Sequence, residues 1–386
     1  MRICFLCDEY PPARHGGIGS STRVMARSLV EAGHQVRVAG VYPQKETAPD
    51  YEIDEGVEVT RLRTSPGRFR WVRSRWMLYR KVAEWARAGE IDLIEVPDMD
   101  GWVAGWPALP VPIMARLHGS ASYFAEEMGG QVSRMQFRLE RASLRRADFL
   151  CSTSRYTADR TARLFRLASP IHTVLYNPIE VAEKPPQEPR SRTRVVFSGT
   201  LVVKKGIVSL VEAWPKVKAA CPAAELHIYG KDARTPGGSM QAFLTARLEG
   251  EAARSVFFHG HVNRDELCVI LRTARAAVFP SYSEAFAMAP MEAMAQGCPT
   301  IYSRRASGPE LIEHGSNGLL VDPDDREDIA RNLTRLLADD ELSRRLGHSG
   351  WQRVCNGFER RLLMARNIDF YRSCQDLFHR SGKKAA

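Results

Sequence analysis

A repeated order of strand, loop and helix most constrains how this chain can fold. The first copy begins with an apolar strand at Ile3–Cys7, continues through a glycine-rich turn and a helix, and returns to a strand at Gln35–Ala39. The same order restarts with a strand at Arg194–Phe197, a glycine-flanked basic loop, a helix at Ile207–Ala220 and a strand at Leu226–Tyr229. We therefore expect two α/β halves, each built on a doubly wound parallel sheet.

The segment between the halves has a different composition. Glu180–Arg190 contains three prolines, alternating charges and only two apolar side chains. Because such a segment contributes no packed element, we expect an interdomain linker there. Beyond Asp339 the sequence predicts amphipathic helix to about Phe378, and then a fraying polar tail.

Charge and the amino-terminal residues bound the class of protein. The net charge is +10, from 55 Lys and Arg against 45 Asp and Glu, which favours anionic partners without choosing among them. The first strand is too short for an export signal, and no apolar run is long enough to span a bilayer. We expect a cytoplasmic chain whose membrane attachment, if any, is peripheral. Cys4 and Cys7 are interpreted as core residues rather than a redox or zinc pair.

The segment Ser281–Thr300 is the sharpest candidate for a binding site. It follows the end of an apolar strand, which is where ligands bind in parallel sheets. A helix predicted to start near Ala289 would point its free N–H groups and positive dipole end at an anion. Glu284 and Glu292 would then accept hydrogen bonds from sugar or ribose hydroxyls. The alternative is that both are solvated acids near a helix end.

Two further positions carry candidate chemistry. Lys204 and Lys205 lie directly after a strand and before a helix, where a lysine can neutralise phosphate, although a plain surface pair is the alternative. His118 follows a short apolar stretch and precedes Gly119, which places it at a strand end. A structural, hydrogen-bonded histidine is the alternative there.

Together these motifs resemble the retaining glycosyltransferase family 4, which has the GT-B fold. Glu284 and Glu292 resemble the paired glutamates of that family, and the match runs nearly end to end. The other matching segments are His15–Gly19, Gly33–Val36, Leu117–Gly119, Ser198–Gly206, Val256–Gly260, Gly308–Ile312 and Asn317–Val321. The resemblance implies two Rossmann-like doubly wound domains facing a cleft: residues 1–180 for the acceptor and 181–360 for the donor. A helix at about 361–380 is expected to cross back to the first domain.

The resemblance also implies roles for individual residues. Glu284 would hold hydroxyls of the donor sugar, Glu292 the ribose, and Lys205 the charge of the leaving diphosphate. His118 would lie close to the reacting sugar without acting as a base. The diphosphate would be bound by two glycine loops, by Lys204 and by backbone groups that open the helix; these residues are Gly16, Gly17, Gly199, Lys204, Phe286, Ala287, Met288 and Ala289.

The expected activity is retaining transfer of a hexose or hexosamine from a UDP or GDP sugar to a glycan, lipid-linked or small-molecule acceptor, in cell-surface polysaccharide or glycoconjugate synthesis. No cofactor is expected. No metal is expected either, because the Asp-x-Asp motif at Asp98-Met99-Asp100, a signature of metal-dependent sugar transfer, lies in the half of the chain that is not expected to bind the donor. The chain departs from the family at Thr200, where an arginine is usual, and at Ala285 and Ala287, where glycines are common. The alternatives are a sugar-nucleotide epimerase of the same fold, a non-catalytic sugar-nucleotide sensor and a nucleic-acid binder, although no nucleic-acid partner is expected.

A basic and aromatic segment stands apart from these motifs. Arg61–Lys81 carries eight basic residues and no acidic one. This composition suits peripheral contact with an anionic membrane, an anionic glycan or lipid-phosphate acceptor, or single-stranded nucleic acid. For its aromatic residues we favour a simpler interpretation: a helix with a solvated face that buries Phe69, Trp71, Trp76 and Tyr79 in the core.

Overall fold

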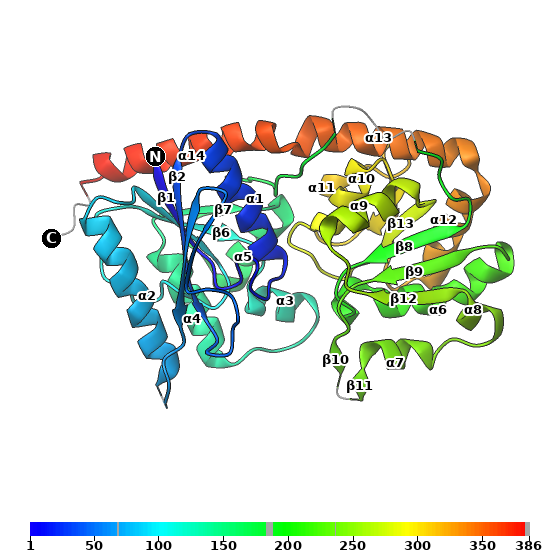
Figure 1. Cartoon of the computed structure of the whole chain (residues 1–386), viewed down its shortest axis with the longest axis horizontal. Helices are drawn as coiled ribbons and strands as arrows, with labels where there is room; N and C mark the ends of the chain where they lie inside the picture. Colours follow the sequence, from blue (N-terminus) through cyan, green and yellow to red (C-terminus); the bar gives the residue numbers. More distant parts are fainter. Residues whose placement is uncertain (68, 183–187, 236, 383–386) are drawn as a thin grey trace. The chain divides into compact units, whose positions relative to one another are not determined.

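The computed structural model describes residues 1–67, 69–182, 188–235 and 237–382 (Figure 1). The chain forms two compact units: residues 1–178 together with those from Arg360 onward, and Ile179–Glu359. The sequence analysis expected a division near residue 180. Within the expected linker, residues 183–187 lie outside the described residues, as do Arg68, Lys383 and Lys384.

The first unit is an α/β sandwich around a seven-stranded sheet of order β3-β4-β2-β1-β5-β6-β7. All strands are parallel except the edge strand β3, which pairs antiparallel with β4 and was not anticipated from the sequence. The elements are β1 (Arg2–Leu6), α1 (Gly17–Glu31), β2 (Gln35–Tyr42), β3 (Tyr51–Asp54), β4 (Val57–Arg63), α2 (Arg70–Arg87), β5 (Leu93–Pro97), β6 (Ile113–Leu117), α3 (Ala121–Glu127), α4 (Arg134–Arg146), β7 (Phe149–Ser152), α5 (Arg155–Phe165) and α14 (Arg360–Arg380).

Alternation along β1 explains how this sheet is covered on both faces. Ile3 and Phe5 pack in one core with α1 and α14, whereas Cys4 and Leu6 face the opposite core with α2, α4 and α5. Cys4 and Cys7 are both buried free thiols, so the expectation of two core residues is confirmed.

Helix α14 belongs to the first unit although it follows the second unit in the sequence. Its buried side chains recur at helical spacing, as in Met364, Tyr371 and Cys374. The Tyr371 hydroxyl donates to Glu95 Oε2 (2.5 Å), and Arg116 binds both oxygens of the same carboxylate (2.7 and 3.1 Å). Arg116 also donates to Asn367 Oδ1 (2.7 Å). A buried ionic network therefore fixes α14 to strands β5 and β6.

The second unit has a six-stranded, fully parallel sheet of order β12-β9-β8-β13-β14-β15. Helices α6, α8 and α12 pack against one face, and α9 and α10 lie on the other (Figure 1). The elements are β8 (Arg194–Ser198), η1 (Val203–Lys205), α6 (Ile207–Ala220), β9 (Glu225–Tyr229), β10 (Arg234–Thr235), β11 (Gly238–Ser239), α7 (Met240–Thr245), α8 (Gly250–Arg254), β12 (Val256–Gly260), α9 (Arg264–Thr273), β13 (Ala276–Phe279), α10 (Met288–Ala295), β14 (Thr300–Ser303), α11 (Gly308–Leu311), β15 (Leu319–Val321), α12 (Arg326–Ala338) and α13 (Asp340–Phe358).

Candidate functional site

The loops after two neighbouring strands of the second unit are held together by backbone contacts. Strands β8 and β13 pair in parallel, so their carboxyl ends meet at one edge of the sheet. The Tyr282 N–H donates to the Lys204 carbonyl (2.8 Å). Gly206, at φ +71°, lies so close to Pro280 that a Cβ there would fall 1.8 Å from the Pro280 carbonyl oxygen. Only glycine allows the basic loop to approach the end of β13 in this way.

This approach brings Lys205 to Glu284. The Lys205 Nζ lies 2.5 Å from Glu284 Oε1, and the Ser281 hydroxyl donates to the same oxygen (3.3 Å). The Glu284 side chain is 10% exposed and that of Lys205 is 26% exposed. Glu284 is therefore not the solvated helix-end acid of the alternative interpretation.

Glu292 lies on α10 and belongs to the same cluster of charges. Its side chain is 20% exposed, and burial raises the pKa of its carboxyl group. The nearby charges of Arg264 and Lys205 act against that rise in pKa. Arg264 Nε lies 3.8 Å from Glu292 Oε1. Lys205 thus acts electrostatically on both glutamates.

The start of α10 supplies donors beside this cluster. Its N-cap residue is Ala287, whose methyl side chain offers no acceptor to the N–H groups of the first turn. Phe286 and Ala287 are buried, and the Phe286 ring packs against Phe358 with 5.3 Å between centroids. Packing therefore fixes the backbone of the predicted diphosphate-binding segment, which continues through Met288 and Ala289.

The basic loop has the compact geometry that its glycines predict. Gly199 has φ +147°, and its N–H donates to the Tyr229 carbonyl (2.9 Å). Burial lowers the pKa of Lys204, and Glu284 acts against this shift. Thr200, at the position where the family usually has arginine, is exposed.

His118 lies in the first unit, directly after β6. Its backbone N–H donates to Asp98 Oδ1 (2.8 Å). Burial and the charge of Arg116 lower the pKa of the imidazole to about 3, so His118 is neutral at physiological pH. Gly119 turns the chain at φ +86°, and the Ser120 hydroxyl caps α3. Asp98 is fully buried, and burial raises its pKa to about 7.

Gly16 and Gly17 open α1, as the glycine-rich turn predicts. A Cβ on Gly17 would meet no atom within 4 Å, whereas one on Gly19 would fall 1.8 Å from the Glu9 carbonyl oxygen. The Glu9 carboxylate also accepts the Gly19 N–H (2.6 Å). The structurally demanding glycine of this turn is therefore Gly19, which the sequence analysis did not single out.

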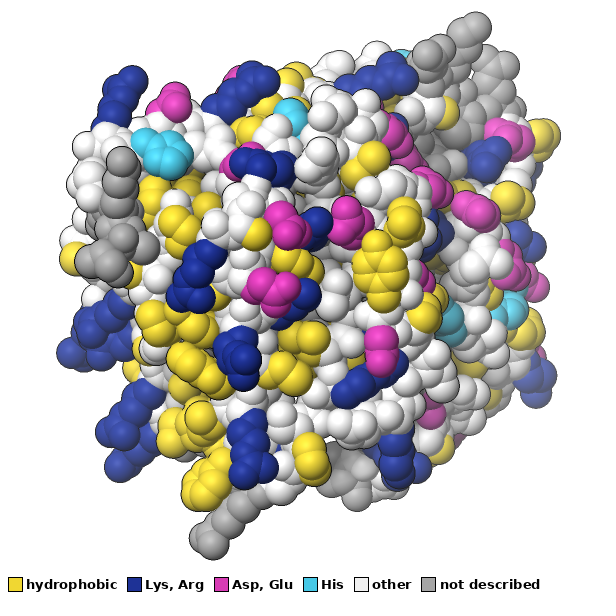
Figure 2. Space-filling view, turned by 60° about the vertical axis from the view of Figure 1, so that its left-hand side comes forward, with side chains coloured by type: hydrophobic (Ala, Val, Ile, Leu, Met, Phe, Trp, Pro, Cys, Tyr) yellow, Lys and Arg dark blue, Asp and Glu magenta, His cyan; other side chains and the backbone are white. Residues whose placement is uncertain are grey.

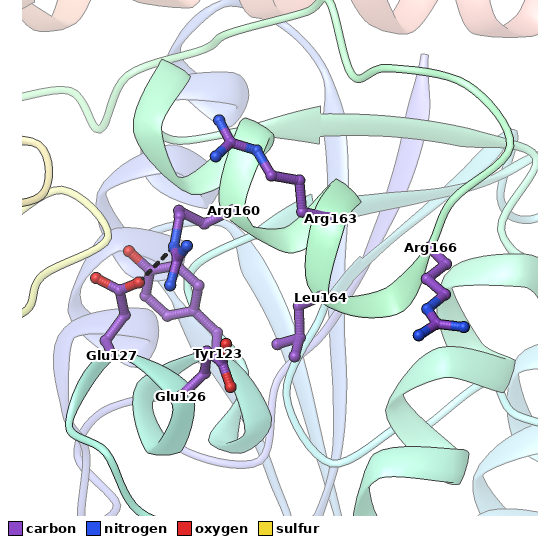
Figure 3. Close-up of a pocket in the computed structure, with 7 residues that line it drawn as sticks. All are labelled: Tyr123, Glu126, Glu127, Arg160, Arg163, Leu164 and Arg166. Atoms are coloured by element: carbon purple, nitrogen blue, oxygen red, sulfur yellow. Dashed lines mark hydrogen bonds and ion pairs between the residues drawn. The ribbon is translucent and has the colours of Figure 1, made fainter.

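A separate pocket of about 250 Å³ lies between α3 and α5 of the first unit (Figure 3). Glu127 is already bound by Arg160 Nε (2.6 Å) and the Tyr156 hydroxyl (2.7 Å). Figure 3 shows the contact between Arg160 and Glu127 as a dashed line. The pocket contains none of the predicted site residues; its lining residues are Tyr123, Glu126, Glu127, Arg160, Arg163, Leu164 and Arg166.

Within the described ranges, no group of three or more His, Cys, Asp or Glu side chains is arranged to hold a metal ion. No helix in that part of the chain combines the length and apolarity needed to cross a bilayer.

Two family models match consecutive parts of the chain. Residues 15–183 match the model described as glycosyltransferase family 4, and residues 179–353 match the model of glycosyl transferases group 1. The chain belongs to glycosyltransferase family 4. It is therefore a glycosyltransferase that uses a nucleotide sugar, and its two Rossmann-like units confirm the expected fold class.

Individual relatives of this family 4 chain extend the comparison. A glycogen synthase of Mycobacterium tuberculosis is 27% identical over 93% of this chain and 91% of its own length. The sucrose-phosphate synthase structure from Thermosynechococcus elongatus has a TM-score of 0.79 at 22% identity, covering 97% of this chain and 98% of the other. The HepE structure from Anabaena in complex with UDP and glucose has a TM-score of 0.72 at 17% identity, covering 97% and 100%.

The structure brings together the predicted residues of the second unit, namely Lys205, Glu284 and Glu292, beside the start of α10. His118, Gly16 and Gly17 belong to the first unit. Sequence reasoning missed Arg264 as the partner of Glu292. Asn263, an N-cap residue, predicts that α9 begins at Arg264, but nothing in the sequence indicates that this residue meets Glu292.

Proposed function

We propose that this family 4 enzyme is a retaining glycosyltransferase that moves a hexose or hexosamine from a UDP or GDP sugar to a glycan, lipid-linked or small-molecule acceptor. The observation that carries the proposal is the position of Lys205, which contacts Glu284 and acts on Glu292 beside the first turn of α10. Lys205, the two carboxylates and the N–H groups that open α10 match the charges and hydroxyls of a nucleoside diphosphate sugar.

The proposed division of labour follows from charge. The diphosphate would bind at the α10 amides and Lys205, because a carboxylate beside phosphate is unfavourable. Glu284 would accept hydrogen bonds from sugar hydroxyls and Glu292 from the ribose. Binding would draw Lys205 from Glu284 toward phosphate, so that Glu284 can turn to the sugar.

The reaction would break the bond between the anomeric carbon and the diphosphate oxygen, and would form a bond from the acceptor oxygen to that carbon on the same face. The acceptor proton would pass to the departing phosphate. Lys205 would stabilise the negative charge that develops on the leaving group. His118, neutral at physiological pH, would contact the sugar through a hydrogen bond rather than by proton transfer.

Metal independence and the lack of a cofactor are part of the proposal. The charge that a divalent ion would neutralise is assigned to Lys205 and the α10 dipole. A role in cell-surface polysaccharide or glycoconjugate synthesis, at a cytoplasmic location, remains a prediction from the sequence. HepE was solved with UDP and glucose, which favours UDP sugars as the first donors to test.

Titration calorimetry of the full chain with UDP-, GDP- and ADP-sugars tests the proposal. We expect one nucleotide class to bind, and Glu292→Ala to weaken that binding while the exposed control Glu313→Ala does not. Binding that survives both Glu284→Ala and Glu292→Ala would contradict the assigned site. Interconversion of donor sugars without an acceptor would instead identify an epimerase.

A second measurement addresses stereochemistry and metal. Proton NMR of the product should show the anomeric configuration of the donor, and activity should persist in EDTA. An inverted product would refute retention, and loss of activity that Mg²⁺ or Mn²⁺ restores would refute metal independence.

A further inference from the structure

The beginning of α2 presents large apolar side chains to solvent. Phe69, Trp71, Val72 and Trp76, together called the apolar tip, are 59%, 42%, 44% and 52% exposed. The expectation that the aromatic residues of this segment lie in the core is therefore wrong for Phe69, Trp71 and Trp76. It holds for Tyr79, which is 5% exposed.

Several of the eight basic residues of this segment contact acidic side chains or backbone carbonyls of the first unit. Arg61 is buried and pairs with Glu52, and Arg63 pairs with Asp50. Arg75 donates to backbone carbonyls of the neighbouring loop, and Lys81 pairs with Glu84. Three exposed arginines around the apolar tip have no acidic partner among the described residues; these are Arg70, Arg73 and Arg80.

The surroundings of the apolar tip extend the same character. No Asp or Glu occurs between Val59 and Ala83. Gln136, in the first turn of α4, donates a hydrogen bond to the Asp100 carboxylate, and Arg75 of α2 donates one to the Asp100 backbone carbonyl. That turn adds Met135, which is 55% exposed. Figure 2, toward its lower left, shows hydrophobic and Lys or Arg side chains interleaved on this side of the molecule.

The arrangement of the aromatic and basic side chains favours one kind of binding partner over others. The Arg75 guanidinium lies over the Trp71 ring (5.6 Å), and Trp76 stacks on Tyr79 (4.9 Å between centroids). Each tryptophan therefore has one covered face, which does not suit a row of stacked nucleic-acid bases. A second copy of the chain would bring like charges together. An anionic bilayer accepts both features, because tryptophans favour its interface and arginines its headgroups.

We propose that the apolar tip inserts into the interfacial layer of an anionic lipid bilayer, with Arg70, Arg73 and Arg80 on the lipid headgroups. This attachment goes beyond sugar transfer and does not depend on the proposed donor site. It would place the first unit on a membrane surface through one end of α2.

Sedimentation of the full chain with vesicles tests the proposal. We expect binding to phosphatidylcholine mixed with phosphatidylglycerol, weakening as salt is raised, and little binding to phosphatidylcholine alone. Arg70→Gln combined with Arg73→Gln should weaken binding roughly thirty-fold. Trp71→Ser combined with Trp76→Ser should weaken it about tenfold or more.

Matched controls lie on the second unit. Arg344→Gln removes an exposed charge on α13, and Phe243→Ser an exposed ring on α7, and both should bind vesicles like the wild type. Circular dichroism checks that the tip variants are folded. The proposal is overturned if the wild type ignores anionic vesicles, or if the tip variants bind as well as the controls. Self-association or oligonucleotide binding through the tip, without vesicle binding, would overturn it equally.

Discussion

Lys205 Nζ and Glu284 Oε1 lie 2.5 Å apart although the two residues come from loops after different strands. The contact exists because β8 and β13 are neighbours and because Gly206 lets one loop lie against the other. The backbone arrangement of these two neighbouring strand ends therefore places both charged residues at the same edge of the sheet.

Removing Lys205 tests its assigned role on the leaving group. We expect Lys205→Ala to lower kcat by about 10²- to 10³-fold, the usual cost of losing one preorganised electrostatic contact. Lys216→Ala, which breaks an exposed Lys–Glu pair with Glu327, serves as the matched control and should leave kcat unchanged. Steady-state kinetics with the preferred donor decides; a drop shared by both variants would refute the assignment.

The ionised Glu292 carboxylate should lower the stability of the fold while it contributes to donor binding. Its pKa is raised in the folded chain, so the folded state binds more protons than the unfolded one and loses stability as pH rises above the ordinary glutamate value. Glu292→Gln should therefore raise Tm at pH 7.5, with the gain disappearing toward pH 4, and should weaken donor binding. Thermal unfolding at both pH values measures this; a lower Tm at pH 7.5 would contradict it.

Arg264 is expected to keep Glu292 ionised. Arg264→Ala removes a charge that lowers the pKa of Glu292, so the acid limb of donor affinity should move to higher pH. Arg272→Ala is the control, since Arg272 is on the same helix but pairs with Glu188. Donor titrations from pH 5 to 8 should separate the two variants. Identical profiles would exclude electrostatic support from Arg264.

His118 should make the fold sensitive to acid. Its imidazole has a pKa of about 3 in the folded chain, so on acidification only the unfolded chain takes up the proton. Stability should fall as pH drops from about 6.5 toward 3, by up to about 2 kcal/mol between pH 7 and 5. His118→Asn should flatten this dependence and exposed His172→Asn should not. Urea unfolding at several pH values would show whether the slopes differ.

The amino-terminal glycines offer a matched pair. Gly19→Ala places a methyl group against the Glu9 carbonyl and should cost about 2 kcal/mol or more, whereas Gly17→Ala meets nothing within 4 Å and should change stability by under about 0.5 kcal/mol. Urea midpoints of the two variants test this. Equal destabilisation would mean that the turn is not packed as described.

Much of the second unit was predictable because its signals are local. Short local patterns predict the apolar strands, the glycine-flanked basic loop and the Ser281–Thr300 segment. Parallel pairing of the strands then brings their ends together. Glu284 and Lys205 could be paired by that rule alone.

Other features depend on contacts between distant residues. The aromatic side chains of α2 have a helical pattern, but nothing in the sequence says that the core ends near Tyr79 and leaves Trp71 and Trp76 outside. The need for Gly19 comes from the backbone of Glu9, and the ion pair of Arg264 depends on where α9 meets α10. Such tertiary relations have no periodic signature.

The packing of α14 against strands β5 and β6 limits when the first unit can finish folding during synthesis. Arg116 and Glu95 are translated first, and Asn367 and Tyr371, which complete their buried network, follow more than 250 residues later. The first unit can therefore be completed only after α14 has been made, whereas Ile179–Glu359 is a separate compact unit that is contiguous in the sequence. Premature termination just after Phe358 would release a nascent product whose first unit lacks α14 and the buried groups that this helix supplies to Glu95 and Arg116.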